Sequence, residues 1–296
     1  MGISTDRSGA PRISEERVVT VSSWRELDDA ISEVSGPRGS RRHGGHSHSS
    51  VVFRGRSRPP HSHRSGLARL DGDYQAVERH LIRNFRKYAH RQAPGPTIWD
   101  WLALGQHHGL PTRLVDWTFS PLVALHFATA SWPREEAMLI GLDCEAAHRL
   151  LPEALREVLD REGALLFTTE MLARRAPDLD SFGKLAAGEE PFMALFEPPS
   201  LDERIVTQSS VLSALSDVTS SVEQWLESHP DLWWAWRIPP EVKAEVRERL
   251  DQAGINERAL LPGLDGLAAW LRRYYSPESC TDHQGDECAP GNTGNA

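Results

Sequence analysis

The side chains best suited to chemistry are concentrated in residues 106–120, which read QHHGLPTRLVDWTFS. His107 and His108 stand next to each other, and the Gly109 and Pro111 that follow predict a turn, where side chains are more often functional than in a core. Because imidazole titrates near neutral pH, either histidine could serve as a general base. We therefore expect a catalytic base at His107 or His108.

The spacing of these residues disfavours several common kinds of site. His107, His108 and Asp116 could offer ligands to zinc, but they lack the i, i+4 histidine pair with an intervening glutamate that zincin-type helices carry. The sequence has no G-x-S-x-G elbow, no Walker loop and no G-x-G-x-x-G fingerprint, which disfavours the common hydrolase, ATPase and Rossmann folds. We expect no metal site.

Three further polar residues fit a nucleotide. Arg54 follows a short apolar run and offers a planar fork to phosphate, Ser120 could hold a sugar hydroxyl, and Gln208 could donate and accept toward a ribose. Each has a plainer alternative. Arg54 could close a salt bridge, Ser120 could cap a helix, Gln208 could be a satisfied strand residue, and Asp116 could orient Arg113.

Helices and short strands that must position these residues alternate irregularly along the chain. Apolar spacing and capping residues predict helices over residues 24–34, 74–88, 97–104, 121–130, 241–253 and 264–273. Short apolar or β-branched runs predict strands over residues 51–53, 113–116, 138–142, 192–196 and 204–211. This order favours a single α+β domain.

Charge is unevenly distributed over the 296 residues. The net charge of −9 argues against a protein that coats nucleic acid non-specifically. Residues 35–70, however, hold eight arginines and no acid. This segment could be a solvated basic loop beside an acidic body or a site for a polyanionic ligand.

Composition also bears on location and core. No stretch approaches the roughly 18 apolar residues of a membrane span, and the first twelve residues are too polar for a signal peptide, so we expect a cytoplasmic protein. The three cysteines are too few and too scattered for a disulfide framework. Most of the ten tryptophans should be core residues. Trp117 is the expected exception, because it lies between Asp116 and Ser120, where a flat ring could stack.

The sequence resembles the FRG-domain proteins of bacteria and their phages. The resemblance rests on Phe53-Arg54-Gly55 and on QHHGLPTRLVDWTFSPLVALHFA at residues 106–128. It covers residues 19–275, leaving a disordered leader (1–18), a low-complexity basic insertion (36–50) and a disordered tail (276–296). The chain departs from the family at Ser210 and Leu212, where a glycine and an aromatic residue are usual.

The order of these motifs is in turn similar to that of ADP-ribosyltransferases. The resemblance implies two small mixed or antiparallel sheets that form a cleft for NAD, with surrounding helices. Because the motifs occur in the same order, the resemblance implies a role in that cleft for each of three residues. Arg54 would hold the phosphate or adenosine side, Ser120 the nicotinamide ribose, and Gln208 the ribose 2′-hydroxyl and the acceptor, with Glu203 as a fallback carboxylate.

The remaining site residues follow from the same resemblance. The catalytic set is then His107, His108 and Gln208. The cofactor-binding set is Arg54, Gly55, Gln106, Asp116, Trp117 and Ser120. The implied activity is transfer of ADP-ribose from NAD to a protein or nucleic acid, in a toxin or phage-defence effector with a possible antitoxin. A non-catalytic nucleotide sensor and an NAD glycohydrolase are the alternatives.

Overall fold

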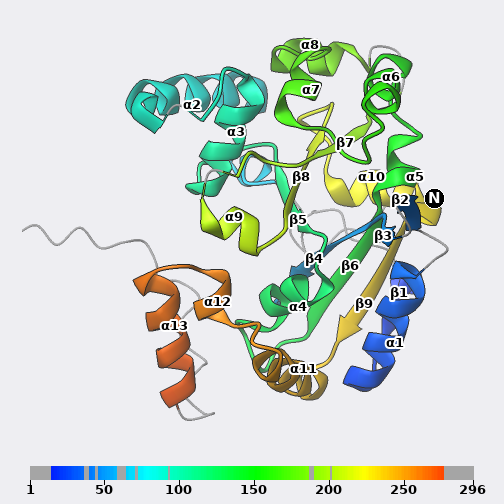
Figure 1. The fold of residues 1–296 in the computed structure, drawn as a ribbon, viewed down its shortest axis with the longest axis vertical. Coiled ribbons are helices and arrows are strands. Elements are labelled where there is room, and N and C mark those ends of the chain that lie inside the picture. The colour runs from blue at the N-terminus through cyan, green and yellow to red at the C-terminus, as the bar shows by residue number, and fades with distance from the viewer. Residues whose placement is uncertain are drawn as a thin grey trace, which may run out of the picture.

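A seven-stranded mixed sheet runs through the computed structural model, in the order β1-β9-β6-β4-β5-β8-β7 (Figure 1). The structure describes residues 15–36, 40–43, 46–58, 65–70, 73–92, 94–186, 190–200 and 202–276. Its strands are β1 (Val18–Thr20), β4 (Val51–Arg56), β5 (Val115–Thr118), β6 (Ala137–Asp143), β7 (Met193–Phe196), β8 (Ser210–Leu215) and β9 (Trp233–Ile238). β1 pairs with β9 in parallel, and the other neighbours are antiparallel.

Helices cover both faces of this sheet. The longer ones are α1 (Trp24–Ser35), α2 (Tyr74–Tyr88), α3 (Ile98–His107), α4 (Pro121–Thr129), α6 (Glu153–Glu162), α11 (Pro240–Gln252) and α13 (Leu264–Tyr275). The shorter ones are α5 (Cys144–His148), α7 (Thr169–Ala173), α8 (Leu179–Lys184), α9 (Glu203–Thr207), α10 (Val222–Ser228) and α12 (Glu257–Leu260). The expected α+β class is confirmed.

The sheet is nearly divided in two. β4 and β5 share one residue pair, Phe53 with Thr118, whereas β4 and β6 share six. We expected a cleft between two separate sheets. The structure instead has one sheet whose two parts are weakly joined between β4 and β5. Because β4 and β5 pair at one point, the rest of each strand lacks the other as a neighbour along this side. This separation leaves space for a site.

Alternation along β4 explains how the strand packs on both faces. Val51 and Phe53 join the cluster formed with α1, α4 and α11, while Val52 joins the cluster on the opposite face. This period of two is what a strand buried on both sides requires. A third cluster lies between β7, β8 and helices α3, α6, α7 and α8, which group together in Figure 1.

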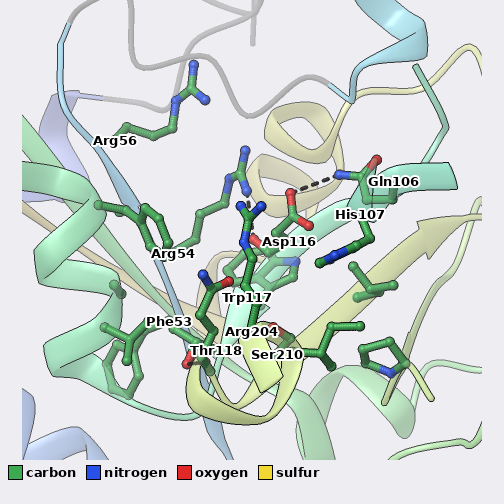
Figure 2. A pocket seen from close by; sticks show the side chains of 18 of the residues that line it. Phe53, Arg54, Arg56, Gln106, His107, Asp116, Trp117, Thr118, Arg204 and Ser210 are labelled. Carbon is green, nitrogen blue, oxygen red and sulfur yellow. Dashed lines mark hydrogen bonds between the residues drawn. The ribbon is translucent and has the colours of Figure 1, made fainter. Parts of the chain in front are cut away.

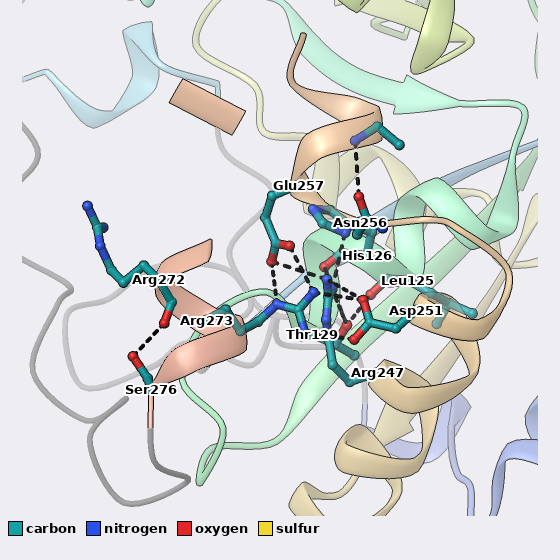
Figure 3. Close-up of polar contacts among 11 residues, drawn as sticks. Leu125, His126, Thr129, Arg247, Asp251, Asn256, Glu257, Arg272, Arg273 and Ser276 are labelled. Atoms are coloured by element: carbon teal, nitrogen blue, oxygen red, sulfur yellow. Dashed lines mark hydrogen bonds and ion pairs between the residues drawn. The ribbon is translucent and has the colours of Figure 1, made fainter. Parts of the chain in front are cut away.

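Helix α4 is fixed from its outer side by a polar network that joins four helices (Figure 3). His126 on α4 lies 3.1 Å from an Arg247 nitrogen of α11, and Arg247 pairs with Glu257 of α12 at 3.1 Å. Arg273 of α13 donates to Glu257 at 2.8 Å and to Asp251 at 2.7 Å. Because α4 lines the cavity described below, this network also fixes one wall of the site.

Most predicted elements are present, with two differences. Residues 204–211 do not form one strand: Asp202 caps a helix, α9, by accepting from Ile205 N at 3.1 Å, and β8 starts only at Ser210. The β-branched residues misled the prediction because the cap and tertiary packing outweigh local strand propensity. Also, β4 continues past Gly55 to Arg56.

The ends and the insertion were described less well by the sequence. Part of the expected leader is structured, since residues 15–17 form a short 3₁₀ helix and β1 begins at Val18. Within the expected loop, β2 (Ser40–His43) and β3 (His46–Ser49) pair as a hairpin. Residues 1–14 and the tail from residue 277 lie outside the described residues.

Candidate functional site

A cavity of about 470 Å³ opens where β4 and β5 meet (Figure 2). Its walls come from β4, β5, β8, the C-terminal end of α3, the inner face of α4, and α9. The volume lies within the range of about 300–1,000 Å³ that is usual for small-molecule sites. The motifs singled out from the sequence therefore converge on one space.

Arg54 lines this cavity and is held by a backbone contact. Its guanidinium donates to the main-chain oxygen of Asp116 at 2.6 Å, across the weak join of the sheet. Burial lowers the pKa of Arg54, and the nearby carboxylates of Asp116 and Glu223 oppose that effect in part. An arginine remains charged despite such a shift. Arg54 is thus a preorganised cation in a partly dehydrated place.

Gln106 holds the Asp116 side chain beside Arg54. The Gln106 amide donates to Asp116 Oδ2 at 2.9 Å, and its oxygen accepts from Thr112 Oγ1 at 2.7 Å. Asp116 therefore has a fixed orientation, as Figure 2 shows. Both residues line the cavity. They help to position Arg54 and can also contact a ligand.

The lining carries a large excess of positive charge. Five arginines face the cavity: Arg54, Arg56, Arg58, Arg69 and Arg204. Among the described lining residues Asp116 is the one carboxylate. Burial, together with the like charges of Arg54 and Arg69, lowers the pKa of Arg56 to about 10. Such mutual repulsion favours a bound anion, and arginine forks match phosphate oxygens in particular.

His107 lies at the edge of the cavity as the last residue of α3, not on a free turn. Its Nε2 is 2.5 Å from Asp202 Oδ2, so the pair links α3 to α9. Burial is the main cause that lowers the His107 pKa, and Asp202 opposes it. A histidine oriented by a carboxylate is an arrangement that general bases use.

His108 and Ser120 lie outside the cavity lining. His108 caps α3 and is exposed, with its ring edge on to that of His107. Ser120 is the N-cap of α4 and accepts from Val123 N at 3.3 Å. The structure therefore gives Ser120 the capping role that we considered as its plainer alternative.

Gln208 reaches the cavity from the end of α9 and not from a strand. Its side-chain amide donates to the Leu260 main-chain oxygen at 2.9 Å, and its main-chain oxygen accepts from Thr118 Oγ1 at 2.6 Å. Ser209, the next residue, has a left-handed φ of 46°, which redirects the chain into β8. Glu203, the fallback carboxylate, lines a separate surface pocket on α9.

Gly55 and Trp117 form the walls of the cavity. A Cβ on Gly55 would lie 1.9 Å from the Ala124 oxygen, so glycine here allows α4 to cross β4 closely. Trp117 is 3 % exposed and its indole donates to Ser213 Oγ at 2.9 Å. Trp117 is thus a core residue that borders the cavity, not the open stacking surface that we expected.

Several residues at or beside the cavity were not predicted from the sequence. Arg204 on α9 extends toward the space beside Asp116 and Arg54 (Figure 2). Asp202, which orients His107, lies 95 positions away in the chain. No local pattern marks such residues, because the fold alone brings them to the site. Among the described residues, no group of three or more His, Cys, Asp or Glu is arranged to hold a metal ion.

Comparison with known proteins gives one match. Residues 49–137 match the FRG domain, a stretch that contains β4, α3, β5 and α4. Residues 49–137 of this chain form an FRG domain. The matched stretch supplies Arg54, Gln106, His107 and Asp116, whereas Arg204 and Gln208 lie beyond it. No curated protein and no solved structure matches the chain. No helix among the described residues is long and apolar enough to cross a membrane.

Proposed function

We propose that the cavity binds NAD and that the chain transfers its ADP-ribose to a macromolecular acceptor. The observation that carries this proposal is the excess of positive charge in a cavity beside Gln208 and His107. Its described lining residues include five arginines and one carboxylate. A pyrophosphate is the anion of a dinucleotide, and guanidinium forks suit it. The similarity of motif order to ADP-ribosyltransferases supports the choice of NAD, as an analogy.

We assign a role to each residue from its position in the cavity. Arg54, with Arg56 and Arg204, would hold the pyrophosphate, and Gln208 would face the nicotinamide ribose from the end of α9. NAD supplies a ribosyl carbon from which nicotinamide can leave. His107, oriented by Asp202, would take the proton of the attacking acceptor group. Burial of Arg54 strengthens its interaction with phosphate by excluding water.

A second candidate, a non-catalytic nucleotide sensor, rests on a specific observation. Asp116 is the one carboxylate among the described lining residues, and Gln106 and Arg54 already engage it. A site that stabilises positive charge on a ribose would use a carboxylate better than the neutral Gln208. The two candidates share the binding site and differ in turnover.

Transfer is tested by incubating the purified protein with NAD labelled in its adenylate phosphate and a cell lysate. We expect label in a protein or nucleic-acid fraction with the wild type, and at least a tenfold loss with His107→Ala. Arg79→Ala is the matched control, because Arg79 lies on α2, forms a 3.5 Å pair with Asp180 and is 60 % exposed.

Two outcomes would count against transfer. Nicotinamide release without any labelled polymer would favour an NAD glycohydrolase. NAD binding without turnover would favour the sensor.

A toxin or defence role would be supported if expression inhibits growth and His107→Ala relieves that inhibition.

A further inference from the structure

One end of the cavity is aromatic. Phe127 on α4 and Trp132 just beyond it both line the space, and Phe127 is 38 % exposed. The Arg58 guanidinium carbon lies 3.9 Å from the centre of the Trp132 ring, a close cation–π contact. The cavity thus ends on a flat ring with a cation stacked on it.

The backbone of Trp132 is held in an unusual conformation. Its φ of 54° lies in the left-handed region, where a bulky side chain is a true outlier. Such conformations persist only when their surroundings enforce them, and they concentrate at ligand sites. The position of the Trp132 ring is therefore imposed by the fold.

Lys243 of α11 supplies that enforcement. Its side chain is buried, and its ammonium donates to the main-chain oxygens of Trp132 at 2.7 Å, Ser57 at 2.7 Å and Glu135 at 3.2 Å. An ammonium has three donors, and all three are used here. Because Ser57 directly precedes Arg58, one buried cation fixes both partners of the cation–π pair.

The order of residues along the cavity assigns its two ends. Arg54 and Arg56 are two residues apart on β4 and so are about 7 Å apart along the strand. Arg54 bonds to the Asp116 oxygen beside Gln106, whereas Arg58 continues the chain past Arg56 and contacts Trp132. The cationic stretch therefore separates a polar end from an aromatic end.

We infer that Trp132, backed by Lys243 and flanked by Arg58 and Phe127, is the subsite for the adenine ring of the dinucleotide. This inference rests on the proposed function, which places the pyrophosphate on the arginines and the nicotinamide ribose at the polar end. The remaining part of NAD is then a flat base at the other end. Bases stack on aromatic rings and on guanidinium planes with little need for directed hydrogen bonds.

The test compares ligands with and without the base. ADP-ribose, ribose 5-phosphate and inorganic pyrophosphate are titrated by calorimetry into the wild type, Trp132→Ala, Trp132→Phe and Lys243→Met. Stacking of one base on an aromatic side chain corresponds to roughly a tenfold change in affinity or more. We expect Trp132→Ala to weaken ADP-ribose at least tenfold and pyrophosphate less than twofold.

The other variants separate the ring from its support. Trp132→Phe keeps an aromatic surface and should stay within about threefold of the wild type for ADP-ribose. Lys243→Met should weaken ADP-ribose several-fold while pyrophosphate binding, which also reports that the variant is folded, is retained. Trp270→Ala, on α13 away from the lining, is the control and should match the wild type.

Failure of this inference differs from failure of the proposed function. Unchanged ADP-ribose affinity in Trp132→Ala, or an equal loss for all three ligands, would overturn the adenine subsite while NAD binding stands. A wild type that binds none of the ligands would overturn both. A Trp132→Ala protein that binds ADP-ribose normally but labels acceptors poorly would assign the ring to the acceptor and contradict the inference.

Discussion

At the scale of single residues, the buried histidines are structural and neutral. His148 donates from Nδ1 to the Leu165 oxygen at 3.0 Å, and its Nε2 accepts from Leu195 N at 3.0 Å. This pairing leaves no place for a second proton. Burial accordingly lowers the pKa of His148 from 6.5 to about 4. A histidine in this state is a bridge between α5 and β7, not a base.

His148 predicts a dependence of stability on pH. In the unfolded chain it takes up a proton near pH 6.5, whereas in the folded protein it does so only near pH 4. The unfolded state therefore gains protons first as the pH falls, and stability is lost between these values. The loss corresponds to about 2–4 kcal/mol.

Urea unfolding of the wild type and of His148→Gln at pH 7 and pH 4 measures this effect. Glutamine can make both hydrogen bonds but does not titrate. Between pH 7 and pH 4, the unfolding free energy of the wild type should fall by about 2–4 kcal/mol more than that of His148→Gln. An unchanged difference would show that His148 titrates normally.

The same scale shows where sequence reasoning reaches its limit. Arg54, Gln106 and Asp116 were predicted because they lie in compact motifs, and the structure brings them to one cavity. Arg204 and Asp202 carry no local signal. Ser120 illustrates the opposite problem, since a serine before a proline-started helix is equally a cap, and the 3.3 Å bond to Val123 N identifies that role.

At the scale of elements, β4 and α4 form the frame of the site. Gly55 lets the helix cross the strand, because a Cβ there would meet the Ala124 oxygen at 1.9 Å and the Ala128 nitrogen at 2.8 Å. Both obstacles are backbone atoms of α4, which cannot rotate aside. The network of His126, Arg247 and Glu257 holds the other side of α4 in place.

Gly55→Ala should therefore lower stability sharply. Forcing α4 away from β4 should cost about 3 kcal/mol or more in unfolding free energy. Gly183→Ala in α8 is the matched control, because its Cβ would make only an ordinary 3.4 Å contact with the Ser216 oxygen. That variant should change stability by less than about 1 kcal/mol.

Thermal or urea unfolding of both variants provides the measurement. If Gly55→Ala were as stable as Gly183→Ala, α4 would not pack closely on β4 at Gly55. Such a result would also remove the explanation given for the glycine of the Phe53-Arg54-Gly55 triplet.

Element prediction succeeded where local chemistry decides the outcome. Capping residues mark several helix starts: Ser23 accepts from Glu26 N, and Thr97 and Asp100 form a reciprocal capping box. It failed at α9, where Asp202 is such a cap but the following Ile205, Val206 and Thr207 favour strands when taken alone. In the helix the capped turn buries Ile205 and leaves Val206 exposed.

At the scale of the whole molecule, topology creates the site. The single pair between Phe53 and Thr118 joins two parts of the sheet, and the cavity lies at that join. Its lining comes from segments between residues 53 and 212. The sequence indicated the α+β class but not this join, because strand order depends on pairings between distant residues, such as Val18 with Ala235.

The charge distribution is also a property of the whole molecule. The chain has a net charge of −9, yet five arginines are among the described residues that line the cavity at the β4–β5 join. The contrast should guide an anionic ligand to one place and repel it from the rest of the surface. Because salt screens exposed charges, ligand affinity should fall as ionic strength rises.

Calorimetric titration of NAD into the wild type, Arg54→Ala and the control Arg79→Ala, at low and high salt, tests the central claim most directly. The account predicts one NAD per chain, weaker binding at high salt, at least tenfold weaker binding by Arg54→Ala, and wild-type affinity for Arg79→Ala. Absence of NAD binding to the folded wild type, or equal affinity of Arg54→Ala and the wild type, would contradict it.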